Sequence, residues 1–182
     1  MYRCYYCSST MRHKHIPTGP DNFLSFLEGI QGGFAIFTGI IAGLSFQVQS
    51  RKLLVITGLI SVIVSAFNSS AIRYSTQHYV DELDGHEKRH KFKSYTVPAV
   101  IEFIVYLLVS FIVLLPLILI DSIPIAIILC AFITVSVLFV AGYYRGWLLR
   151  THPVKDGFEL AFLGAAIIFI GTLSGYIVKL LI

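Results

Sequence analysis

The stretch that decides the fold is Val97–Leu149, which reads VPAVIEFIVYLLVSFIVLLPLILIDSIPIAIILCAFITVSVLFVAGYYRGWLL. Its only charged residues are Glu102, Asp121 and Arg145. A helix needs about 20 apolar residues to cross a bilayer. The stretch holds two such runs, 97–120 and 123–149, separated by the polar pair Asp121–Ser122. It therefore predicts two consecutive membrane-spanning helices.

Three more apolar runs flank this pair, at about 23–46, at 53–74, and from 158 to the C-terminus. Of the 182 residues, 56% are hydrophobic and only 13% are charged, whereas an ordinary soluble domain has about 25% charged residues. A soluble chain of this length could not bury so much apolar surface. We therefore expect an all-α integral membrane protein with five transmembrane helices. It consists of a tail, 1–21, and one membrane domain, 22–182.

Three prolines mark positions within the predicted helices. Pro98 and Pro124 suit the first turn of the third and fourth spans, where a missing backbone N–H is tolerated. Pro116 lies inside the third span and should kink its outer end.

Lysine and arginine are distributed unequally between the two sides of the membrane. With the N-terminus in the cytosol, the cytosolic segments hold Arg3, Arg12, Lys14, Arg73, Lys88, Arg89, Lys91, Lys93, Arg145, Arg150 and Lys155. The opposite side holds Arg51, Lys52 and Lys179. Since basic loops stay inside, the N-terminus and segment 75–96 are predicted to be cytosolic. The net charge of +4 then reflects membrane topology and not a nucleic-acid partner.

Two spans carry faces of small residues, which allow helix backbones to approach closely. The glycines concerned are Gly32, Gly39 and Gly43 in the first span, and Gly164, Gly171 and Gly175 in the fifth. Two interpretations stay open from the sequence: helix contact within one protomer, or a seam between two protomers.

Acids and hydroxyls gather at one depth in the predicted bundle. Glu28 and Glu102 each lie about five residues into their spans, and Asn68 and Ser69 lie about as far from the inner end of the second span. All four are thus roughly 8 Å below the cytosolic surface. A carboxylate in a membrane is costly, which makes this set a candidate metal site on a transport path. The structural alternative is an ion pair of Arg73 with Glu28 or Glu102.

Two polar segments outside the spans also carry metal-ligand side chains. Imidazoles and carboxylates together suit Fe²⁺, Mn²⁺ or Zn²⁺, although a solvated loop beside anionic headgroups also explains the first segment. Its candidates are His78, Asp81, Glu82, His86, Glu87 and His90. The N-terminal tail offers a possible tetrahedral site, with a disordered tail as the alternative. Its candidates are Cys4, Cys7, His13 and His15.

Short motifs across the spans resemble the vacuolar iron transporter family, whose members have five spans and a cytosolic segment between the second and third. The similarity covers roughly 22–182. Its motifs are Leu27–Ala35 with Gly39, Thr57–Leu59, Ser65–Ser70, Tyr74, Pro98–Ala99, Leu114–Pro116, Gly142, Gly164–Ala166 and Gly175.

The resemblance implies export of Fe²⁺, and often Mn²⁺, from the cytosol in exchange for protons, by a homodimer with its path on the two-fold axis. Glu28 matches the family's first-span acid. Three positions depart from the family: Ser69 replaces a Met, Arg73 an acid, and Ser61 a Glu of the plant-type pattern. The cytosolic helices are shortened to 75–96. A site of hard oxygen ligands would suit Mn²⁺.

The leading hypothesis is therefore a multi-pass divalent-metal/proton antiporter, with Fe²⁺ or Mn²⁺ as cargo and no tightly bound cofactor. Its partners would be the lipid bilayer, metal ions, protons and a second copy of the chain. Its membrane would be the plasma membrane in a prokaryote, or a vacuolar or other endomembrane in a eukaryote. The alternative is a non-transporting scaffold or sensory protein, since Arg73 would repel a cation. We see no nucleophile–base pair within the spans, so we do not expect an enzyme.

Overall fold

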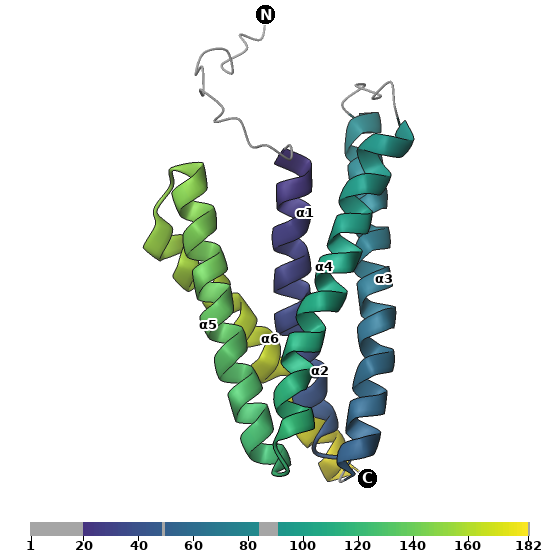
Figure 1. Ribbon diagram of the computed structural model, residues 1–182, viewed down its shortest axis with the longest axis vertical. Coiled ribbons are helices and arrows are strands. Elements are labelled where there is room, and N and C mark those ends of the chain that lie inside the picture. The colour runs from purple at the N-terminus through teal and green to yellow at the C-terminus, as the bar shows by residue number, and fades with distance from the viewer. Residues whose placement is uncertain (1–19, 49, 84–90, 182) are drawn as a thin grey trace, which may run out of the picture.

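A computed structural model describes residues 20–48, 50–83 and 91–181, and nearly all of them are helical. The elements are α1 (Pro20–Gln31), the π-helix η1 (Gly32–Ile36), α2 (Phe37–Leu44), α3 (Arg51–Leu83), α4 (Lys91–Leu119), α5 (Ile123–Leu149) and α6 (Pro153–Leu181). The first three form one continuous rod, and among the described residues five rods are long and apolar enough to cross a membrane. The predicted all-α, five-span fold is confirmed, and Figure 1 shows the rods running between the two ends of the bundle.

Several helices extend past the ends of the apolar runs. The second was expected to end at Tyr74 but continues to Leu83, and the third was expected from Val97 but begins at Lys91. The described parts of segment 75–96 are thus helical on both sides, while 84–90 lie outside the described residues. Hydropathy finds only the part of a helix that contacts lipid, so polar extensions escape it.

The early start of α4 also corrects the expectation for Pro98. This residue lies inside the helix and not in its first turn, as does Pro116. Pro124 does stand at the start of α5, as predicted.

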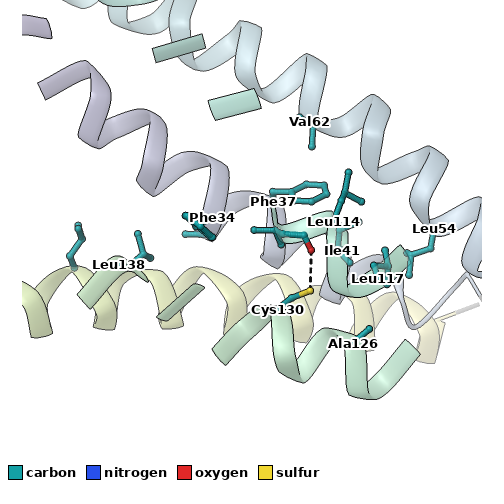
Figure 2. Packing of buried hydrophobic residues seen from close by; sticks show 13 residues of the cluster. Phe34, Phe37, Ile41, Leu54, Val62, Leu114, Leu117, Ala126, Cys130 and Leu138 are labelled. Carbon is teal, nitrogen blue, oxygen red and sulfur yellow. Dashed lines mark hydrogen bonds between the residues drawn. The ribbon is translucent and has the colours of Figure 1, made fainter. Parts of the chain in front are cut away.

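The hydrophobic core lies where the first rod crosses the other four (Figure 2). Phe34, Phe37 and Ile41 pack there against residues of α3, α4, α5 and α6. The thiol of Cys130 is buried and donates a hydrogen bond of 3.2 Å to the carbonyl of Val113. The small Cys130 side chain thereby lets α4 and α5 lie close together, as a core residue.

The α2–α6 crossing is a contact of glycine backbones. A Cβ built on Gly43 would lie 2.6 Å from the carbonyl oxygen of Gly171, and one on Gly175 would lie 2.1 Å from the carbonyl oxygen of Gly43. Gly39 lies against Gly171 and Ile167 in the same way. These glycines are therefore at a close contact within one chain, and only residues without a Cβ fit at this separation.

The other two glycines of the predicted small-residue faces, Gly32 and Gly164, lie against side chains instead of backbone. A Cβ on Gly32 would lie 2.6 Å from the ring of Tyr106 in α4, and one on Gly164 would lie 2.2 Å from a methyl group of Leu138 in α5. Both contacts are again between helices of one chain.

The π-helix has polar partners on two neighbouring helices. Ser110 donates to the carbonyl of Gly33 at 3.3 Å, and Thr134 donates to that of Phe34 at 3.5 Å. The hydroxyls of Thr38 and Thr134 also bond to each other at 2.7 Å, and both residues are buried. These bonds join the π-helix to α4 and α5.

Candidate ion-binding site

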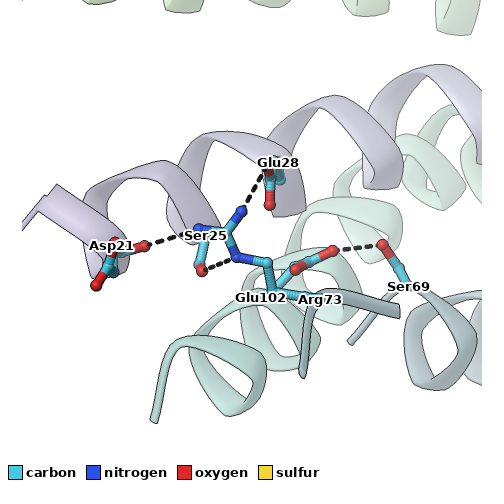
Figure 3. Close-up of polar contacts among 6 residues, drawn as sticks. All are labelled: Asp21, Ser25, Glu28, Ser69, Arg73 and Glu102. Atoms are coloured by element: carbon cyan, nitrogen blue, oxygen red, sulfur yellow. Dashed lines mark hydrogen bonds and ion pairs between the residues drawn. The ribbon is translucent and has the colours of Figure 1, made fainter. Parts of the chain in front are cut away.

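Arg73, near the polar end of α3, is bonded to three groups on α1. Its guanidinium donates to Oε1 of Glu28 at 2.9 Å, to Oγ of Ser25 at 3.1 Å, and to the backbone oxygen of Asp21 at 3.4 Å. Figure 3 shows the guanidinium reaching across to α1 between these partners. The ion pair of Arg73 with Glu28, left open by the sequence, is present in the structure.

Glu102 on α4 is the second carboxylate of this cluster and the more buried residue, at 3% exposed. One of its oxygens accepts a hydrogen bond from the Ser69 hydroxyl (Figure 3). Its other oxygen, Oε2, has no hydrogen-bond partner among the described residues. Ser69 lies one turn before Arg73 on α3, so Glu102 and the Arg73–Glu28 pair lie near the same level of the bundle.

Helix packing explains why these side chains meet. Gly29 lets α1 approach α4 so closely that a Cβ would lie 2.9 Å from the backbone oxygen of Glu102. On α3, Ser69 and Arg73 are four residues apart and so share a face. The ring of Tyr106, one turn after Glu102 and fully buried, packs against Gly32.

The structure does not bring the fourth predicted member, Asn68, into the same cluster. Asn68 is exposed on α3, about 100° around the helix from Ser69. Within one chain the candidate site thus contains Glu28, Glu102 and Ser69, with Arg73 bonded to Glu28. All these donors except the guanidinium are oxygens.

The predicted metal ligands on the polar extension of α3, His78, Asp81 and Glu82, do not share one site: His78 and Glu82 pair with each other, and Asp81 has a different partner. His78 Nε2 lies 3.2 Å from Glu82 Oε1, as expected for residues four apart on a helix. Asp81 instead accepts a hydrogen bond of 2.7 Å from the buried Tyr95 hydroxyl, whose ring also packs on His78. In the described residues, no group of three or more His, Cys, Asp or Glu side chains could hold a metal ion.

Several predicted ligands lie outside the described residues. They are His86, Glu87 and His90 in the segment after α3, and Cys4, Cys7, His13 and His15 in the tail.

Sequence reasoning missed Ser25 and the backbone oxygen of Asp21 as partners of Arg73. Ser25 is fully buried and stands three residues before Glu28, on the same helix face. The rule that residues three and four apart are neighbours, applied toward the N-terminus from Glu28, would have found it.

The cluster has the negative charge and the oxygen ligands of a cation site, but the Arg73 guanidinium neutralises part of that charge. With both acids ionised, two negative charges and the Arg73 charge leave a net −1. Glu28 remains 38% exposed in its side chain, whereas Arg73 is only 12% exposed. An incoming cation could reach Glu28 from outside but would compete with the guanidinium for it.

Comparison with known proteins identifies the chain. No curated protein matched in a search, but the model of the VIT family matches residues 65–176, which is more than half of the chain. The match runs from the middle of α3 into α6 and includes Ser69, Arg73 and Glu102, but not Glu28. The family consists of multi-pass membrane transporters and suggests metal ion transport. The motif resemblance is thus confirmed, and the chain belongs to the VIT family.

Proposed function

We propose that this protein moves a divalent metal cation, iron or manganese, out of the cytosol in exchange for protons. The observation that carries the proposal is the Glu28–Arg73–Glu102–Ser69 cluster in a chain of the VIT family. Two acids from different helices meet there at a depth where carboxylates are costly, and such acids are typical of ion and proton pathways.

In this proposal Glu28 exchanges partners during transport. Arg73 holds it in the state described here, and a metal ion or a proton replaces the guanidinium in other states. Carboxylates bind metal in their deprotonated form, so loading the ion releases protons and unloading it takes them up. The half-exposed Glu28 is the accessible ligand, and the buried Glu102 with Ser69 lies behind it.

The donor set bears on which ion is carried. Ser69 and the two glutamates offer only oxygens, and carboxylate and hydroxyl oxygens suit harder ions such as Mn²⁺ better than softer ones. We therefore propose that manganese is carried at least as well as iron.

A homodimer would complete the site. The described residues of one chain offer two acids here, which is few for a divalent ion, and a second copy would add another Glu28. Asn68 also lies exposed on α3, on a side that carries Ile60, Val64 and Phe67, which are 59%, 63% and 68% exposed. An amide facing hydrocarbon is unfavourable, so a second copy packed on this side would shelter it.

The second candidate is a non-transporting scaffold or sensory protein on the same fold. The three bonds of Arg73 to α1 favour it, because a cation fixed beside Glu28 would repel a metal ion.

Transport by purified protein in liposomes separates the two candidates. Uptake of Fe²⁺, Mn²⁺, Zn²⁺ and Ca²⁺ would be measured under an imposed pH gradient, together with the internal pH. We expect metal and proton fluxes in opposite directions, lost in Glu28→Gln and kept in Glu159→Gln, an exposed acid on α6. No flux of any ion in well-folded protein would support the scaffold, and full flux in Glu28→Gln would exclude Glu28 as a ligand.

A further inference from the structure

A crevice opens at the end of the bundle opposite the Arg73 cluster. It has a volume of about 510 Å³, within the range of about 300–1,000 Å³ that ligand pockets occupy. Three elements form its walls: the end of α2 and the turn after it, the first turns of α5, and the last turns of α6. Figure 1 shows these segments converging near the C-terminus.

The crevice combines apolar walls with one basic group at its rim. Phe46, Ile123, Pro124 and Ile127 supply apolar surface, and Lys179 is the one charged side chain among the described residues that line it. The Lys179 ammonium lies 6.0 Å from the centre of the Phe46 ring, where the aromatic face holds it at the rim. Among the described residues that line the crevice none is an acid, so Lys179 gives this lining a positive charge.

The spacing of these groups fits a molecule with a charged head and an apolar tail. Thr172 also lines the crevice, and it stands seven residues before Lys179 on α6. Seven residues of helix span about 10 Å, so the apolar part extends from the ammonium toward the membrane interior. A lysine near the end of a membrane helix directs its ammonium to the headgroup level, where it can pair with the phosphate of an anionic lipid.

The geometry points to a binding site for an anionic phospholipid. Its phosphate would pair with the Lys179 ammonium, and one acyl chain would lie along Phe46, Ile127 and Thr172. A zwitterionic lipid would fill the apolar part equally but would bring its own cation beside Lys179. The site is therefore expected to distinguish headgroups by charge, and the metal-transport proposal is not needed for it.

Lipid binding to the purified full-length protein tests the site. Native mass spectrometry in detergent would compare phosphatidylglycerol with phosphatidylcholine of the same acyl chains. The wild type should bind phosphatidylglycerol more tightly. Lys179→Gln should lower that affinity about fivefold, toward the value for phosphatidylcholine. Lys179→Arg should keep the preference.

Two further variants separate this site from general lipid adhesion. Lys155→Gln removes an exposed charge near the start of α6, at the other end of the bundle, and should leave the preference unchanged. Ile128→Trp, at an exposed lining position, should obstruct the crevice and weaken both lipids. The proposal is overturned if the wild type binds both lipids equally, or if Lys179→Gln keeps full affinity. It is also overturned if inorganic phosphate alone binds as strongly as phosphatidylglycerol.

Discussion

At the scale of single residues, the pairing of Arg73 with Glu28 decides how the cluster behaves. Glu28→Gln keeps the shape of the side chain but removes its charge, leaving the guanidinium with two uncharged partners, Ser25 and the Asp21 carbonyl. Because Glu28 is 38% exposed, water compensates in part, and we expect a loss of about 1–2 kcal/mol in the free energy of unfolding. Thermal unfolding in detergent would measure it.

The double variant Glu28→Gln, Arg73→Gln is the control for this prediction. It removes both charges and should recover most of the lost stability, which would give a favourable coupling energy between the two positions. A single variant as stable as the wild type would mean that the pair contributes little to folding, and that Glu28 is free to serve a cation.

A second residue-scale prediction concerns Ser69, whose hydroxyl is bonded to the buried Glu102. Ser69→Ala would leave this carboxylate with neither oxygen hydrogen-bonded among the described residues, at a cost of about 1–3 kcal/mol. Ser61→Ala is the matched control, since the Ser61 hydroxyl donates only within its own helix, to the Thr57 carbonyl at 2.9 Å. Equal unfolding temperatures for the two variants would show that the bond to Glu102 is unimportant for stability.

The sequence could predict which residues lie at this depth but not which of them pair. Counting residues from the span ends placed Glu28, Ser69 and Glu102 at one level, and the structure brings them to one cluster. The same count placed Asn68 at this level, but depth in the membrane does not tell which side of the helix a residue occupies, and Asn68 is exposed. The partner of Arg73 depends on how closely α1 and α3 approach, which only the packing of the whole bundle determines.

At the scale of elements, the α2–α6 crossing depends on bare glycine backbone. In Gly175→Ala the new methyl group would meet the Gly43 carbonyl at 2.1 Å, and this backbone can move only if the helices separate. In Gly164→Ala the group met at 2.2 Å is a methyl of Leu138, a side chain that can change rotamer. We expect Gly175→Ala to destabilise the protein by about 1–3 kcal/mol, and clearly more than Gly164→Ala. Unfolding temperatures in detergent would show the order, and the reverse order would contradict this packing.

The existence of the five helices could be predicted from hydropathy, but their ends and irregularities could not. Ser75–Leu83 is helical although polar, because Tyr95 and His78 pack across the α3–α4 pair beyond the apolar runs. The π-helix at Gly32–Ile36 accepts hydrogen bonds from Ser110 and Thr134, which are far away in sequence. No local pattern contains such contacts, and this also explains why the glycine faces could not be assigned to a contact within the chain.

At the scale of the whole molecule, the basic residues separate between the two ends of the bundle. The start of α3 meets the α4–α5 connection at one end, where Arg51 bonds to Asp121 at 2.5 Å. The last turn of α6, which carries Lys179, lies at that same end (Figure 1). Arg73, Arg145 and Lys155 belong to the other end. The helices thus arrange the basic residues as the prediction of a cytosolic N-terminus requires, while the direction of the bundle in the membrane stays a prediction.

Cysteine labelling at the two ends of α3 tests that direction. Ser50→Cys and Glu82→Cys, both at exposed positions, would be made separately in a chain with Cys4 and Cys7 replaced by Ser. Cys130 can stay, because it is only 2% exposed and should not react. In intact cells or vesicles, a membrane-impermeant maleimide should reach the cysteine at 82 only from the cytosolic side, and that at 50 only from the opposite side.

The positive-inside rule favours this outcome. Eleven basic residues belong to the predicted cytosolic side and three to the opposite side, and in the reversed orientation the larger group would have to cross the membrane. Reversed labelling would place the Glu28–Arg73 cluster at the non-cytosolic end, and export could then no longer begin with capture of the ion there.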